Sequence, residues 1–247
     1  MSFPNIIFGA DQTVFSTTTT RRFPFGTRLY TQDGREFRYT ENGGTAIGTG
    51  VGGRLFQSSA PSANYDNQAI ATAAAVGARS IDVTLGGAPA ADLFAFGYMA
   101  VNDVDGEGHI YQVESNTSAA SPAVVTLFPP GIIVALTTSS EVNLVLNPNK
   151  DVVIMPTATT APCMGATPTA IPVDRFFWGQ CRGPASVLTD GTVTVGLSVM
   201  HSNGTAGAVE AWGLAEAAPP TEISTAVGKV MIVNATTEHS TIWLQVD

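Results

Sequence analysis

Short segments in which apolar and polar residues alternate recur along this chain, and turn-forming residues separate them. The clearest example spans residues 28–40, where two alternating segments flank Asp33 and Gly34. Asp-Gly between such segments is a strong hairpin signal, because both residues accept the positive φ of a tight turn. A second pair of segments flanks the loop of residues 103–108, and Asp190-Gly191 is predicted to turn the chain into a strand over residues 192–199. No long amphipathic helical period competes with this pattern, so the sequence predicts an all-β fold.

The spacing of these segments divides the chain into three parts. Residues 63–156 and residues 157–247 each hold several short predicted strands separated by turn residues, as in small antiparallel β barrels or sandwiches. Residues 1–62 precede them as an N-terminal arm followed by the predicted hairpin. Residues 3–25 show no clear period, and we expect this extended arm to need a partner before it becomes ordered.

Composition and charge limit the classes of partner. Of the 247 residues, 44% are hydrophobic and only 13% are charged, compared with roughly 25% in ordinary soluble proteins. The net charge is −9, although arginines outnumber acidic residues within the first 54 positions. An acidic body disfavours nucleic acid, whose phosphates require a basic surface. No secretory signal and no apolar run of about 18 residues is visible, so we expect a protein made in a cytoplasm and not held in a membrane.

The two cysteines, Cys163 and Cys181, lack the spacing of a redox or zinc motif. Cysteine buries readily, so two ordinary buried thiols are the favoured interpretation. A disulfide formed in an assembled particle is the alternative.

The segment from Gly48 to Gly53 formally contains the pattern G-x-G-x-x-G. A dinucleotide site also requires a preceding strand, a helix that opens at the third glycine, and an acidic residue about 20 positions later. The residues that follow are too few before Pro61 to form that helix. We therefore expect no cofactor here.

One loop alternates acidic residues and a histidine: Asp103, Asp105, Glu107 and His109. A calcium loop that began at Asp103 would need glycine at its sixth position, which Gly108 supplies, and an acidic residue at its twelfth, which is Glu114. Glu114 falls at the end of a predicted strand and not at a helix entry. A solvated turn is the favoured interpretation, and a bound cation is the alternative.

Nucleophilic catalysis has no sequence support in this chain. The pattern G-x-S-x-G is missing, and His109, His201 and His239 lie in or beside predicted turns without an activated serine or cysteine motif near them. Triads assemble in space, so this observation favours a non-enzymatic protein without excluding catalysis.

Three stretches carry a family resemblance, and they cover most of the chain. They are Gly26 to Tyr30 with Asp33 to Tyr39, then Gly106 to Tyr111 running on to Asn147-Pro148, and finally Phe177 to Gln180 with Gly183 to Leu188, Asp190-Gly191 and Gly228 to Val230. In these motifs the chain resembles capsid decoration proteins, also called cement proteins, of tailed bacteriophages. We carry the role of these proteins over to this chain but assign no equivalent contact residues.

The resemblance implies a structural virion protein and not an enzyme. Such a protein binds the major capsid protein on the outer surface of an icosahedral shell, commonly as a homotrimer, and stabilises the shell by bridging capsomers. The basic N-terminal part fits this role, because arginine side chains pair bidentately with carboxylates on a partner. The candidate capsid-binding residues are Arg21, Arg22, Arg28, Arg35 and Arg38.

An alternative function belongs to another class: a tail-associated or receptor-binding protein that recognises a host surface glycan. Exposed Trp178, Trp212 or Trp243 would make the contact, although tryptophans in a small barrel more often belong to its core. A polysaccharide depolymerase is a third possibility, which would require carboxylates clustered in a groove.

Overall fold

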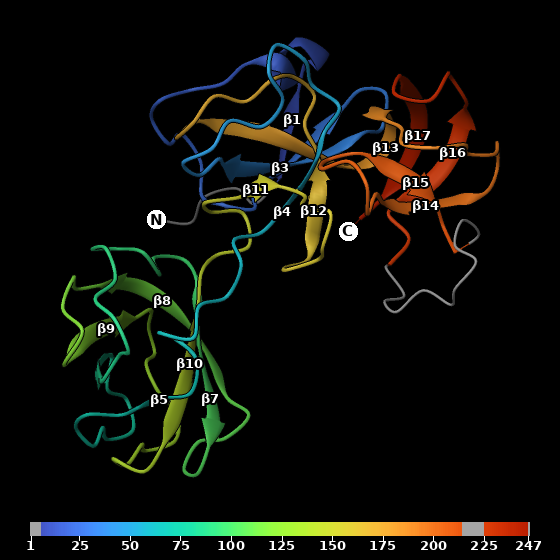
Figure 1. Ribbon diagram of the computed structural model, residues 1–247. Coiled ribbons are helices and arrows are strands. Elements are labelled where there is room, and N and C mark those ends of the chain that lie inside the picture. Colours follow the sequence, from blue (N-terminus) through green and yellow to red (C-terminus); the bar gives the residue numbers. More distant parts are fainter. Residues whose placement is uncertain (1–5, 214–224, 247) are drawn as a thin grey trace. The chain divides into compact units, whose positions relative to one another are not determined.

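The computed structural model describes residues 6–213 and 225–246, and its fold is all-β, as the sequence predicts (Figure 1). Within the described residues the helical element is one short 3-10 helix, η1 (Asp11–Phe15). In that part of the chain, no helix has the length and apolar character needed to span a membrane.

The chain folds into two compact units. One unit is the central segment Ala60–Asn147, and the other combines Met1–Ser59 with Pro148–Asp247. The predicted N-terminal and C-terminal parts therefore belong to a single unit, in contrast to the three successive parts that the sequence suggests. Their strands pair with each other, which requires contacts between residues far apart in the sequence.

The described part of the central unit is a six-stranded antiparallel sheet in the order β5-β10-β7-β8-β9-β6. Its strands are β5 (Gln68–Ala69), β6 (Ser80–Val83), β7 (Tyr98–Asp103), β8 (Ile110–Asn116), β9 (Ala123–Leu127) and β10 (Glu141–Val145). Alternate residues of these strands are buried in one core, around Phe94, Met99 and Leu127. The predicted hairpin around residues 103–108 is confirmed, because β7 pairs with β8.

The other unit is built on an eleven-stranded sheet in its described residues, with the main path β1-β2-β3-β13-β17-β16-β14-β15. Its strands are β1 (Ile6–Gly9), β2 (Arg28–Thr31), β3 (Glu36–Glu41), β4 (Leu55–Gln57), β11 (Val153–Ile154), β12 (Cys163–Ala166), β13 (Phe176–Leu188), β14 (Ser198–His201), β15 (Val209–Ala211), β16 (Gly228–Ile232) and β17 (His239–Gln245). In Figure 1, β14 to β17 lie together in orange and red.

The hairpin predicted at Asp33 and Gly34 is confirmed. β2 and β3 pair in antiparallel fashion, and Gly34 has φ 83° in the turn between them. Thr31 and Arg35 close the turn through a backbone hydrogen bond of 3.1 Å from the N–H of Thr31 to the carbonyl of Arg35.

The sequence reasoning misplaced the strand that follows Asp190 and Gly191. We expected these residues to turn the chain into a strand over residues 192–199, but β14 covers only Ser198–His201 and pairs with β15 and β16. Strand β13 is instead one continuous element of 13 residues. Its first half pairs with β3 and its second half with β17, so it joins the two predicted parts into one sheet.

The expectation that the N-terminal arm needs a partner to become ordered is wrong for its described residues. β1 pairs with β2 in parallel, and the chain forms a further bridge between Thr18 and Phe176. Val14 is completely buried, and Phe23 packs on Trp178 with a ring-centroid distance of 5.5 Å. Three apolar residues of the arm, Ile7, Val14 and Phe23, pack in one core cluster with residues of β2, β3 and β13.

Candidate functional site

The pairing of β1, β2 and β3 places two rows of side chains on one side of the sheet. Ile6, Arg28 and Arg38 are partners in one row, and Phe8, Tyr30 and Glu36 are partners in the next. The residues between them, among them Leu29 and Phe37, point to the opposite side and are buried in the core. With one residue of β13 added, we call this surface the edge face: Ile6, Phe8, Arg28, Tyr30, Glu36, Arg38 and Arg182.

Aromatic and arginine side chains dominate the edge face. Phe8 is 84% exposed, and its ring centroid lies 6.2 Å from that of Tyr30. Arg38 donates a hydrogen bond of 3.2 Å from Nη1 to the carbonyl oxygen of Gly26, which holds the side chain against the hairpin. The edge face therefore combines a large exposed apolar ring with cationic groups.

Arg182 completes the edge face, and it was not among the residues singled out from the sequence. Its Nη1 lies 3.7 Å from Oε1 of Glu36, and about half of its side chain remains exposed. With Arg28 and Arg38, three arginines face one glutamate, so the edge face is positive on an otherwise acidic chain. No local sequence signal indicates Arg182, because its place depends on the pairing of β3 with the distant β13.

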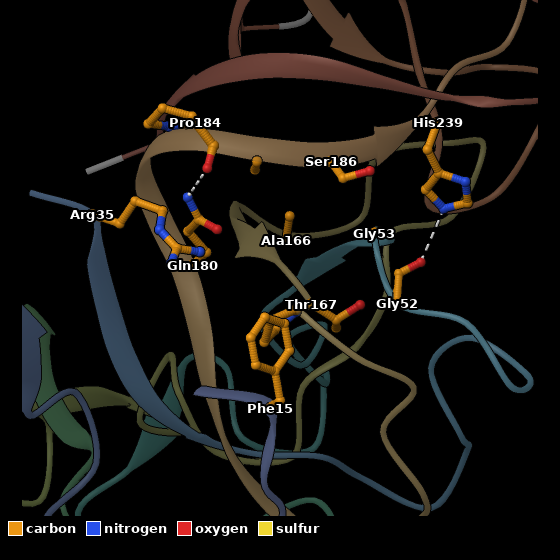
Figure 2. A pocket seen from close by; sticks show the side chains of 12 residues that line it. Phe15, Arg35, Gly52, Gly53, Ala166, Thr167, Gln180, Pro184, Ser186 and His239 are labelled. Atoms are coloured by element: carbon orange, nitrogen blue, oxygen red, sulfur yellow. Dashed lines mark hydrogen bonds between the residues drawn. The ribbon is translucent and has the colours of Figure 1, made fainter. Parts of the chain in front are cut away.

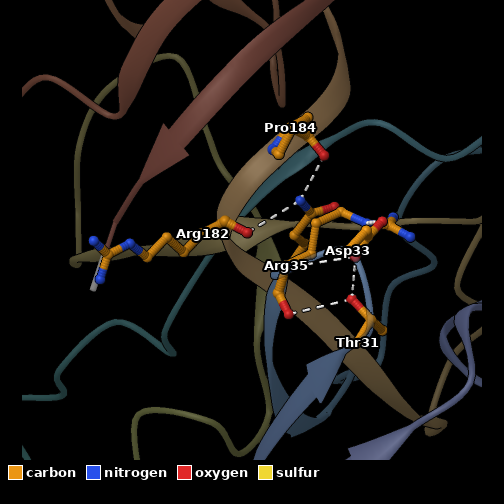
Figure 3. Close-up of polar contacts among 6 residues, drawn as sticks. Thr31, Asp33, Arg35, Arg182 and Pro184 are labelled. Carbon is orange, nitrogen blue, oxygen red and sulfur yellow. Dashed lines mark hydrogen bonds and ion pairs between the residues drawn. The ribbon is translucent and has the colours of Figure 1, made fainter.

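Arg35 lies on the opposite side of the hairpin from the edge face. Its Nε donates to Oδ2 of Asp33 at 2.7 Å, and its guanidinium lies over the ring of Phe37 at 5.4 Å from the centroid. Burial lowers the pKa of Arg35 from its ordinary value. Figure 3 shows the Arg35–Asp33 pair at the hairpin turn, while the side chain of Arg182 extends away from it. Arg35 therefore stabilises the turn and is not part of the edge face.

Arg21 and Arg22 are exposed on the segment that crosses Tyr39. The guanidinium of Arg21 lies 5.2 Å from the ring centroid of Phe25, and the backbone N–H of Arg22 donates to the hydroxyl of Tyr39 at 3.0 Å. The structure thus divides the five candidate arginines: Arg28 and Arg38 share one surface, and the other three lie outside it.

A pocket of about 300 Å³ opens beside Arg35 (Figure 2). Two of its polar side chains have partners within the chain: His239 Nε2 lies 3.1 Å from the carbonyl of Gly52, and Gln180 Nε2 donates to the carbonyl of Pro184 at 2.8 Å. Gly53 forms part of the wall with φ 69°, and a Cβ there would lie 2.5 Å from His239. Gly53, the last glycine of the G-x-G-x-x-G segment, thus allows close packing at the wall.

A second pocket, of about 660 Å³, is lined by Cys163 and His201 among other residues. Burial raises the pKa of the Cys163 thiol to about 11, so the thiol is neutral and a weak nucleophile near neutral pH. His201 Nε2 lies 3.0 Å from the hydroxyl of Thr159. Cys163 and Cys181 are both free thiols. Cys181 is buried, as predicted, whereas Cys163 is only partly buried, so the expectation of two buried thiols is confirmed for one of them.

The acidic loop of the central unit has the contacts of a turn. Asp103 accepts the backbone N–H of Val104 at 2.9 Å, and Asp105 accepts the hydroxyl of Thr137 at 3.0 Å. His109 Nδ1 lies 2.8 Å from the carbonyl oxygen of Gly106. Across the described residues, no group of three or more His, Cys, Asp or Glu side chains could hold a metal ion.

The three tryptophans differ in exposure. Trp178 is buried, with Tyr39 and Phe23 packed against it, so it is not available to a ligand. Trp212 and Trp243 are 45% and 40% exposed.

Comparison of the chain with protein-family models, with curated proteins and with solved structures finds no match.

Proposed function

We propose that this chain is a structural virion protein that decorates the outer surface of an icosahedral phage capsid and stabilises it by bridging capsomers. The observation that carries the proposal is the composition of the edge face. Aromatic side chains and arginine are the residue types enriched at protein interfaces, where a few of them supply most of the binding energy. The resemblance in the Gly-and-turn motifs supplies the class of partner, the major capsid protein.

The chemistry of the edge face specifies the complementary surface. Three arginines around one glutamate favour an acidic patch on the capsid protein, and Phe8 would enter an apolar pocket within that patch. An exposed ring of this size costs free energy in water, which docking would recover. A capsid presents many equivalent sites, so a modest affinity at each site is sufficient for attachment when several copies of this chain associate. We therefore propose that the free protein is a homotrimer.

Titration of the purified protein onto phage particles that lack it tests the proposal. Phe8→Ala should weaken binding tenfold or more without changing thermal stability, because the ring is largely exposed. Arg28→Glu and Arg182→Glu should weaken binding in a salt-dependent way. The matched controls are Phe15→Ala, a half-exposed ring outside the edge face, and Arg79→Glu, whose side chain pairs with Glu114 in the central unit.

Unchanged capsid occupancy by the Phe8 and arginine variants would show that attachment does not use the edge face. Copy number distinguishes the shell from the tail, because hundreds of copies per virion indicate a shell protein and a few dozen or fewer indicate a tail protein. Light scattering at micromolar concentration tests the trimer, and a monomeric mass would contradict it for the free protein.

A further inference from the structure

The outer side of the sheet formed by β13 to β17 carries a second surface, defined by strand register. Ser198 pairs with Lys229, Lys229 pairs with Trp243, and Trp243 pairs with Pro184. At the other end, Trp212 donates its backbone N–H to the carbonyl of Ser198 at 3.1 Å. We call this line of side chains the tryptophan row: Trp212, Ser198, Lys229, Trp243 and Pro184.

The tryptophan row points away from the core. The neighbours of its members along the strands, Val199 and Leu244, are completely buried, so alternation places the row on the opposite side. Trp243 lies on β17 and Trp212 directly follows β15; these two strands are three inter-strand steps apart, which corresponds to about 14 Å at the usual spacing. Lys229 and Ser198 lie between them.

We infer that the tryptophan row binds an acidic polysaccharide. A pyranose ring has an apolar C–H face that can stack on an indole and hydroxyl groups at its rim that need donors and acceptors. Two exposed indoles separated by a hydroxyl and an ammonium offer both kinds of contact along one line. The inference goes beyond the proposed function and does not depend on it.

One feature of the row favours a saccharide over a protein partner, and a second favours an acidic saccharide over a neutral one. Lysine and serine are depleted at protein interfaces, yet Lys229 and Ser198 occupy the middle of the row. Two cationic side chains lie beside Trp243 in the strand register: Lys229 is its partner, and Arg182, which also pairs with Glu36, lies two residues from Pro184 on β13. Glu210, near Trp212, already accepts the backbone N–H of Asn203 at 3.3 Å. Sugar carboxylates would therefore be placed near Trp243.

Affinity electrophoresis of the full chain tests the inference, with alginate and an array of bacterial acidic capsular polysaccharides as probes and neutral dextran as the comparison. We expect retardation by at least one acidic polysaccharide and none by dextran. Trp212→Ala and Trp243→Ala should weaken the binding tenfold or more, Trp243→Phe should retain most of it, and Lys229→Gln should lower its salt sensitivity. Ile232→Ala, which removes a side chain that is 57% exposed and lies outside the row, is the matched control.

Three results would overturn the inference. The first is binding to no acidic polysaccharide of the panel, and the second is equal binding to dextran. The third is the combination of a changed oligomeric state in Trp243→Ala with no saccharide binding by the native chain. That combination would show that the row forms contacts between copies of the chain. Circular dichroism of each variant confirms that it is folded. Because the assay uses free protein without capsids, its outcome is independent of whether the edge face binds a shell.

Discussion

Replacing Val14 by alanine tests whether the N-terminal segment belongs to the folded unit. Val14 is completely buried and lies in the same core cluster as Leu29 and Phe37. The substitution removes two methyl groups, each worth about 0.8 kcal/mol of transfer free energy. The cavity that remains adds to this loss, so we expect the free energy of unfolding to fall by about 2 kcal/mol. For a unit of this size, that corresponds to a melting temperature lower by about 4–8 °C.

Tryptophan fluorescence is a suitable readout, because all three tryptophans lie in the unit that contains Val14. Phe15→Ala is the matched control, since its ring is half exposed, and we expect it to lower the free energy of unfolding by about 1 kcal/mol, less than Val14→Ala. An unchanged melting temperature for Val14→Ala would refute the reasoning, because the segment would then be a detachable arm. The same reasoning predicts that removing residues 1–25 destabilises the unit even when no capsid is present.

Three further substitutions or measurements test individual sites. Asp151→Asn should stabilise the protein at neutral pH. Burial, reinforced by the nearby Asp174, raises the pKa of Asp151, so the folded state binds the proton of this carboxyl more tightly than the unfolded chain does. The contribution of Asp151 to stability therefore falls as the pH rises. The difference in urea midpoint between variant and native protein should therefore widen between about pH 4 and 7. Gly53→Ala should cost more than about 2 kcal/mol in urea unfolding, whereas Gly50→Ala, with a similar φ but open space around it, should cost about 1 kcal/mol. Cys163 should react with a disulfide reagent much more slowly at pH 8 than in urea-unfolded protein, and faster as pH approaches its pKa of about 11.

The features that the sequence predicts correctly are local. The hairpins at Gly34 and at residues 103–108 depend on residues that are neighbours along the chain, and turn chemistry identifies them. The pairing of β3 with β13 could not be predicted in this way. It joins segments far apart in the sequence, and the alternation of each strand is compatible with many partners.

Strand alternation held more information about the candidate arginines than their charge did. Arg38 and Glu36 share one side of β3, whereas Arg35 shares the side of Phe37. Alternation within the confirmed hairpin could therefore have separated Arg35 from Arg38 without a structure. It could not have placed Arg21 and Arg22, because the segment that holds them follows no strand period.

Arg182 reaches the edge face because of an irregularity in the β13–β3 pairing. Gln180 is the partner of Phe37, and Arg182 is the partner of Glu36, so two residues advance on β13 while one advances on β3. In a regular ladder Cys181 would oppose Glu36, and Arg182 would point to the side of Arg35. The bulge instead leaves Cys181 buried, with its thiol donating to the carbonyl of Glu36 at 3.4 Å, and it turns Arg182 toward the solvent beside Glu36. One extra residue in β13 thus decides which surface carries the positive charge of Arg182. The alternation of residues along β13 alone does not reveal this bulge.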